Sequence, residues 1–122
     1  MSRKLSESEK SFLRRLVGDT APFRQEMEVQ MENCTVEDRR GGEILEFYPL
    51  TSAMIDIGST VLGGGSDYDI DGVPIIISLL QRDGYLWKLD ISRADAEPVK
   101  GHIDYDRVRS LGFRQGVSLE RP

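Results

Sequence analysis

The chain is poor in the residues that several classes of protein require. Among its 122 residues there is one cysteine and one histidine, and aromatic residues make up 7%. A single cysteine cannot form an internal disulfide, which excludes a disulfide-stapled secreted scaffold. One cysteine and one histidine also provide no nitrogen and sulfur ligand set for a structural zinc site.

Long apolar segments are scarce as well. The first residues are polar and contain no signal-peptide core, and the longest apolar run, residues 73–80, is interrupted by Pro74 and Ser78. This run is too short to cross a bilayer. With 39% apolar and 30% charged residues, we expect one soluble, cytoplasmic domain spanning residues 1–122. Residues 114–122 are expected to form a loosely ordered tail.

Charge is distributed unevenly along the chain. The net charge is −5, made up of +3 over residues 1–18, −9 over residues 19–72 and +1 over residues 73–122. An acidic middle segment repels a nucleic-acid backbone, which argues against nucleic-acid binding. It would attract a basic protein and speed the encounter with it. The alternative is an acidic surface that serves only solubility.

The N-terminal part of the chain predicts helices. Ser6 and Glu9 form the sequence of a capping box, and the apolar residues that follow have helical spacing up to Gly18. A second, short helix is expected from Pro22. Beyond it, residues 29–36 alternate between apolar and polar with one shift, which predicts a strand with a bulge.

Two hairpins are expected after these helices. A turn at residues 38–42 leads into a strand at residues 43–48, and Asp83-Gly84 joins strands at residues 73–81 and 85–92. The isoleucine run at residues 75–77 predicts a central strand with both faces covered. Simple alternation places Trp87 in the core, in reach of the first helix.

The remaining segments give weaker signals. Residues 50–66 are interpreted as a connection in which the GGGS sequence at residues 63–66 is a flexible linker. Asp104 is expected to cap a last helix that ends at Gly112. The order of elements predicts an α+β fold, with one or two N-terminal helices packed on an antiparallel sheet of about four to five strands.

The sequence DYDIDG at residues 67–72 resembles the start of a calcium loop, with Asp67, Asp69 and Asp71 at the first, third and fifth positions. Three carboxylates in one turn repel one another unless a cation joins them. The twelfth position, however, is Ser78 where a bidentate glutamate is needed. A calcium-binding module and a metal-free acidic turn therefore stand as alternatives.

Catalytic patterns are weak. The GGGS sequence lacks the lysine of a phosphate-binding loop, and Cys34 with His102 would make a nucleophile and base only if the fold brought them together. The position of Cys34 in a strand-like stretch suits a buried cysteine that serves packing. We expect no cofactor and no enzyme, although an unrecognised carboxylate site is an alternative.

Several motifs together resemble a known family. They are RKLSESE at residues 3–9, RGGEI at 40–44, DIDGVPI at 69–75 and GYLWKLDI at 84–91. They look like a family of small bacterial proteins of unassigned function, similar to the immunity and antitoxin proteins encoded beside toxins. The resemblance implies inhibition of a toxin and carries no catalytic residues with it.

We therefore expect a non-enzymatic binding protein that occludes a basic site on a partner, in the manner of an immunity protein or antitoxin. The acids would contact the cationic site, and the two tyrosines would anchor the contact because a tyrosine offers area and a polar tip at low entropic cost. The expected partner is a basic toxin domain, with no nucleic acid and no membrane. The expected contact residues are Glu43, Glu46, Tyr48, Asp67, Tyr68, Asp69 and Asp71.

Overall fold

A computed structural model describes residues 2–113 of the chain, so the tail expected at residues 114–122 lies outside the described part. Helices come first and strands follow, which confirms the α+β class. In chain order the elements are β1 (Arg3–Lys4), α1 (Glu7–Val17), α2 (Arg24–Glu32), β2 (Cys34–Arg39), the 3-10 turn η1 (Arg40–Gly42), β3 (Ile44–Pro49), β4 (Val61–Tyr68), β5 (Pro74–Arg82), β6 (Tyr85–Arg93), the 3-10 turn η2 (Tyr105–Arg107) and β7 (Arg109–Ser110).

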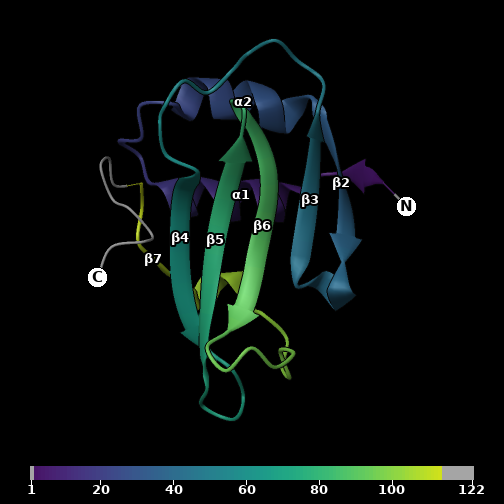
Figure 1. The fold of residues 1–122 in the computed structure, drawn as a ribbon, viewed down its shortest axis with the longest axis vertical. Helices are drawn as coiled ribbons and strands as arrows, with labels where there is room; N and C mark the ends of the chain where they lie inside the picture. The colour runs from purple at the N-terminus through teal and green to yellow at the C-terminus, as the bar shows by residue number, and fades with distance from the viewer. Residues whose placement is uncertain (1, 114–122) are drawn as a thin grey trace.

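The strands of the described residues form one antiparallel sheet of seven strands in the order β1-β2-β3-β6-β5-β4-β7, more than the four to five predicted. The additional strands are β4 and the two-residue strands β1 and β7. In Figure 1, α1 passes behind the strands and α2 crosses above them, while no helix formed by residues 2–113 covers the front face of β3, β6, β5 and β4. We call this uncovered side the open face.

The capping box at the start of α1 is confirmed. The Glu9 amide donates to the Ser6 hydroxyl at 3.1 Å, and the Ser6 amide donates to the Glu9 carboxylate at 2.8 Å. These two bonds satisfy amides that the first helical turn leaves free. The apolar stripe behind the cap is also confirmed, because all its members are buried, namely Leu5, Phe12, Leu13, Leu16 and Val17.

The strand predicted for residues 29–36 is wrong in its first half. Helix α2 runs through Val29 and Met31, and β2 begins only at Cys34. The buried side chain of Gln30 explains the longer helix, because it accepts from the Leu86 amide and donates to the Gly84 carbonyl, both at 2.8 Å. A contact 54 residues away in sequence thus outweighs the local alternation.

The segment predicted to be a flexible linker is the middle of β4. Residues 63–65 pair with β5 over Leu79, Ser78 and Ile77, and Gly65 and Ser66 also pair with β7. Glycine is needed here because α1 and β7 approach the strand backbone closely: a β-carbon on Gly65 would lie 2.7 Å from Cγ1 of Val108. The residues after β4 continue into the well-paired hairpin of β5 and β6.

The Asp83-Gly84 turn is confirmed. Both residues have the positive φ of a two-residue hairpin turn, 56° for Asp83 and 90° for Gly84. A β-carbon on Gly84 would lie 3.0 Å from Cε of Met54 and 3.1 Å from the carbonyl oxygen of Ile55. The turn therefore needs glycine for its backbone conformation and also for space.

Replacing Gly84 with valine is expected to lower the free energy of unfolding by about 2 kcal/mol, because the valine combines a strained φ with overpacking. Urea denaturation measures this change. Asp83→Gly is the matched control, since it removes the strained side chain from the same turn and should change stability by less than about 1 kcal/mol. Equal losses for the two variants would contradict the argument.

The prediction that Trp87 lies in the core is wrong. The register of β5 and β6 passes from Leu80–Lys88 to Gln81–Leu86, which leaves Trp87 as the extra residue of a bulge. Leu86 is buried in its place, while Trp87 is half-buried outside the core with the Arg82 guanidinium 4.4 Å from its ring centre. A bulge shifts the alternation by one residue, and the simple pattern cannot show this.

Strand β5 is central, as predicted, but only one of its faces is covered. Ile75 and Ile77 are each 1% exposed, whereas Ile76 between them is 51% exposed on the open face.

The prediction of a helix after Asp104 is also wrong. Asp104 caps η2 by accepting from the Asp106 amide at 3.0 Å, and the chain then becomes β7, because Arg109 pairs with Ser66.

Candidate functional site

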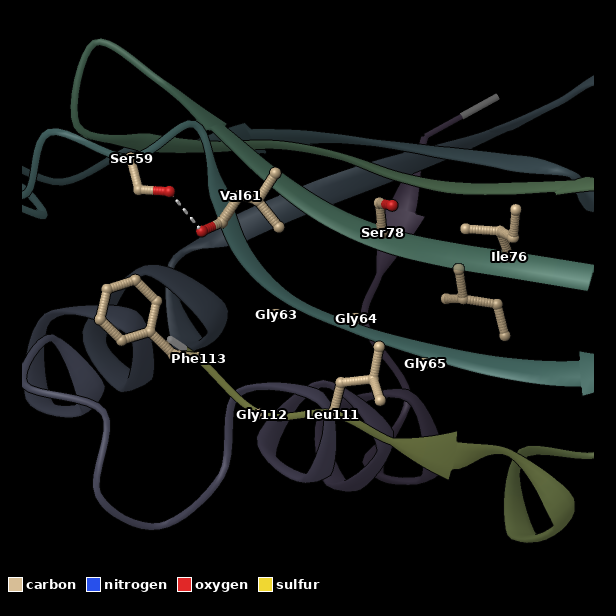
Figure 2. A pocket seen from close by; sticks show the side chains of 11 residues that line it. Ser59, Val61, Gly63, Gly64, Gly65, Ile76, Ser78, Leu111, Gly112 and Phe113 are labelled. Carbon is tan, nitrogen blue, oxygen red and sulfur yellow. Dashed lines mark hydrogen bonds between the residues drawn. The ribbon is translucent and has the colours of Figure 1, made fainter. Parts of the chain in front are cut away.

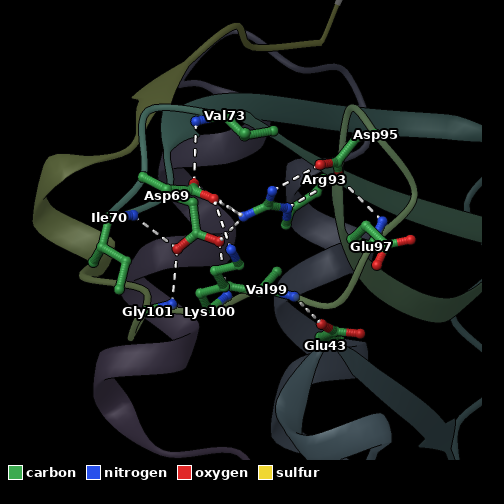
Figure 3. A network of polar contacts seen from close by, with 11 residues as sticks. Glu43, Asp69, Ile70, Val73, Arg93, Asp95, Glu97, Val99, Lys100 and Gly101 are labelled. Carbon is green, nitrogen blue, oxygen red and sulfur yellow. Dashed lines mark hydrogen bonds and ion pairs between the residues drawn. The ribbon is translucent and has the colours of Figure 1, made fainter.

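The acidic turn after β4 is built around Asp69, which is 6% exposed. Its carboxylate accepts hydrogen bonds from the amides of Ile70 at 2.8 Å and of Lys100 and Gly101 at 2.7 Å each. Arg93 completes the set from the end of β6, with Nη1 2.7 Å from Oδ2 (Figure 3). Asp69 therefore joins β4, β6 and the loop at residues 94–101.

Arg93 connects two further carboxylates to this site. Its Nη1 lies 3.0 Å from the carboxylate of Asp71, and its Nη2 lies 2.7 Å from that of Asp95. Lys100 adds a second cation, with Nζ 3.2 Å from Asp71. The Arg93 side chain is almost entirely buried, so its charge is balanced within the protein.

These contacts set the ionisation of the acids. Burial alone would raise the pKa of Asp69, but the Lys100 amide, Arg93 and the other donors hold that pKa well below its usual range. Arg93 is also the main reason that the pKa of Asp95 is lowered to about 2. Both groups are therefore carboxylates under all ordinary conditions.

The three acids of the predicted calcium loop are bound by basic side chains of the protein. Asp67 pairs with a different cation from the other two acids, because its Oδ1 lies 3.5 Å from Nη2 of Arg107. The cation that joins Asp69 and Asp71 is the guanidinium of Arg93. Among residues 2–113, no group of three or more histidines, cysteines or acids is placed to hold a metal ion. The turn accordingly has a structural role in which a side chain supplies the positive charge.

The network predicts a loss of stability in acid. A carboxyl group whose pKa is lower in the folded than in the unfolded state stabilises the fold above its unfolded pKa, and this contribution is lost as the pH falls through the folded pKa. For Asp95 the fall runs from its usual pKa of 3.8 towards about 2. Urea unfolding measured at intervals from pH 5 down to about pH 2 should therefore show a free energy of unfolding that decreases steadily as the pH falls.

The variant Asp95→Asn provides the control for this prediction. It removes one of the titrating groups, so its free energy of unfolding should depend less on pH between about 4 and 2 than that of the original chain. A pH dependence identical in the two proteins would show that the ion pair with Arg93 does not stabilise the fold.

The remaining acids predicted for partner binding also have contacts within the protein. One carboxylate oxygen of Glu43 accepts from the Val99 amide at 2.6 Å, and Glu46 forms an ion pair with Arg39. With Asp69 buried as well, the acids predicted for partner binding do not form a free acidic surface.

The two predicted tyrosines do share one side of the sheet. Tyr48 of β3 is 41% exposed and Tyr68 of β4 is 65% exposed. Register places both on the open face, together with Ile76 opposite Ser66. The fold therefore brings the expected aromatic anchors onto one surface, although they lie in strands that are not adjacent.

A groove of about 270 Å³ lies on β4 and β5 beside Ile76. In Figure 2 the three glycines of β4 pass between Ile76 on one side and Leu111 and Phe113 on the other. Because glycine carries no side chain, the backbone forms the floor of this groove and apolar side chains form its border. The groove was not predicted from the sequence, because the same glycines were expected to form a linker.

The charged side chains on the open face are mixed in sign. Glu37 and Glu46 both pair with Arg39, and the guanidinium of Arg82 and the ammonium of Lys88 both lie over the Trp87 ring. By register the face carries the cations Lys4, Arg39, Arg82, Lys88 and Arg109 and the acids Glu37, Glu46 and Asp90. With five cations and three acids the open face is not acidic, and its exposed apolar and aromatic side chains distinguish it.

Cys34 is a buried thiol at the start of β2. Burial raises its pKa to about 11, so the group is a neutral thiol at physiological pH. Its sulfur lies 3.8 Å from the Met31 carbonyl oxygen. This environment is that of a packing residue.

Comparison with known proteins gives one match. A family described as a domain of unknown function, DUF6984, matches residues 2–103. Neither the curated proteins nor the solved structures include one that matches the chain. Among the described residues, no helix has the length and apolar character needed to cross a bilayer.

Proposed function

The chain belongs to the DUF6984 family, and we propose that it is a non-enzymatic binding protein that covers a site on a partner protein with the open face of its sheet. The observation that carries the proposal is the set of exposed apolar and aromatic side chains on that face, with Tyr48, Tyr68 and Ile76 each more than 40% exposed. Exposed apolar side chains that adjoin on a soluble domain mark interaction surfaces, and Tyr68 and Ile76 lie on the adjacent strands β4 and β5.

The groove beside Ile76 supports this proposal. Energetically dominant contacts in protein interfaces are aromatic or apolar side chains that fill a pocket on the partner. A volume of about 270 Å³ accommodates one large apolar side chain. We propose that the partner inserts such a side chain between Ile76 and Leu111, while Tyr68 packs at the side of the contact.

We propose further that the protein is an inhibitor of the immunity or antitoxin type, which acts in the cytoplasm on a basic toxin domain. The net charge of −5 supports a basic partner, because opposite net charges speed diffusional encounter. In this scheme charge acts over distance, and the apolar open face makes the contact.

The experiment is a capture assay with the full chain as bait in an extract of its native host. The double variant Tyr68→Ala/Ile76→Thr keeps a β-branched residue in β5 and removes the apolar contact. We expect the partner retained by the original chain to bind the variant at least about tenfold more weakly. The purified partner then shows whether its own activity is inhibited by the original chain and spared by the variant.

Leu50→Thr is the matched control, because Leu50 is 84% exposed in the connection after β3 and lies outside the open face. Its binding should equal that of the original chain. Association should also slow as salt rises, since the screening length is about 8 Å at physiological ionic strength. Equal capture by all three proteins would overturn the open-face proposal, and salt-independent association would overturn the basic partner alone.

A further inference from the structure

A second cavity, of about 630 Å³, lies between η1 and the loop after β6. Its volume is within the range of small-molecule sites, about 300–1,000 Å³. Arg40, Gly41 and Gly42 border it on one side, and Val99, His102 and Tyr105 are among the residues on the other. This cavity is separate from the groove on β4 and β5, with which it shares no lining residue.

The acids that line this cavity are already engaged. Asp38 accepts from Nε of Arg3 at 3.1 Å and from Nη2 at 3.2 Å. Glu43 accepts from the Val99 amide at 2.6 Å, a bond that fixes the loop next to η1 (Figure 3). Asp38 is thus paired with a cation, and one oxygen of Glu43 is taken by the amide of Val99.

The basic side chains of the cavity, in contrast to its acids, have no partner in the described part of the chain. Arg40 and His102 are exposed, and neither forms a side-chain hydrogen bond or ion pair with another residue of the described part of the chain. A guanidinium offers five donors in a planar arrangement that matches a carboxylate or phosphate. The next acid along the chain, Asp104, is occupied in capping η2. Arg40 and His102 are therefore the basic lining side chains whose donors no other residue of the described part takes up.

The other lining groups are apolar and held in place. The Tyr105 ring stacks on Phe12 of α1 with ring centres 4.1 Å apart and an interplanar angle of 4°. Val99 and Ile103 are partly buried against the core. Open space beside Gly41 and Gly42 lets a ligand approach the backbone of η1. Such a site combines an apolar wall with a few polar groups that orient a ligand.

We propose that this cavity binds a small organic anion, a carboxylate or phosphate on an apolar or aromatic body. Arg40 and His102 hold the anionic group, and Val99, Ile103 and Tyr105 contact the body. This site is independent of the open face, so the protein carries a ligand site in addition to its proposed protein contact.

Titrations of the full chain with benzoate and with phenyl phosphate, followed by amide NMR spectra, test the proposal. We expect saturable shifts at residues 40–43 and 99–105, with dissociation constants of about 1 mM or below for such small probes. The stronger of the two probes identifies carboxylate or phosphate as the preferred group. Benzylamine and benzyl alcohol, which have the same ring, should bind at least about tenfold more weakly.

Arg40→Asn is the decisive variant. Asparagine tolerates the positive φ of 53° at this position, so the turn is kept while the cation is removed, and affinity for the stronger anion should fall about tenfold or more. Arg82→Gln, an exposed arginine on the open face, should leave affinity unchanged. Unsaturable binding, equal binding of benzylamine, or unchanged affinity in Arg40→Asn would each overturn the proposal.

Discussion

Replacing Gly63 with alanine is expected to lower the free energy of unfolding by about 3 kcal/mol, because the added methyl group enters space held by backbone atoms. Its β-carbon would lie 2.6 Å from the carbonyl carbon of Leu16 and 2.9 Å from the amide nitrogen of Val17. These atoms belong to the last turn of α1, which cannot move without opening the core on that side of the sheet. Chemical denaturation monitored by circular dichroism measures the loss.

Gly58→Ala is the matched control for this prediction. Gly58 has no atom within 4 Å of an added β-carbon and no positive φ. The same substitution there should change stability by less than about 1 kcal/mol, in the stabilising direction, since alanine restricts the unfolded chain. If both variants lost the same stability, the close approach of α1 to β4 would not be the reason for the glycine.

Replacing Asp69 with alanine is expected to have an effect of similar size. The change leaves the amides of Ile70, Lys100 and Gly101 without their acceptor, and it leaves the buried Arg93 short of one counter-ion. Removing one partner of a buried pair is far more damaging than the pair itself is stabilising. We expect the melting temperature to fall by about 10 °C or more.

Asp71→Ala separates burial from charge in this experiment. Asp71 also pairs with Arg93, but its side chain is 31% exposed against 1% for Asp69, and its one backbone bond is to Val73. Its loss should lower the melting temperature by less than half as much. Similar falls for the two variants would show that the turn is stabilised by the number of carboxylates paired with Arg93 and not by the buried acceptor.

Local features of the sequence predicted the parts of the fold that local interactions determine. The Ser6–Glu9 capping box and the Asp83-Gly84 turn depend on residues within a few positions of one another, and both are confirmed. The predictions that are wrong concern distant contacts or an irregularity in the strand pairing. The glycines of β4 are explained by α1 and β7, and the outward position of Trp87 is explained by a bulge whose position the alternation does not reveal.

The same distinction applies to the candidate site. The sequence left a calcium loop and a metal-free acidic turn as alternatives, and the cation that joins Asp69 and Asp71 is Arg93, 24 residues from Asp69. One signal was present: Arg93 continues the inward positions of Leu89 and Ile91 in β6, and an arginine in an apolar register needs a buried partner. The cavity beside η1 had no comparable signal, because two distant loops form it.

The two-residue strand β7 lies outside the residues that match the family. The match to DUF6984 ends at residue 103, whereas Val108 is buried and Arg109 and Ser110 pair with β4. A chain shortened to the matched residues would lose the pairing of β7 with Gly65 and Ser66 and would expose this glycine-rich part of β4. Such an uncovered strand is a template for a second molecule. The shortened domain should therefore pair edge to edge with itself, so an assembly state measured on it would be a product of the cut.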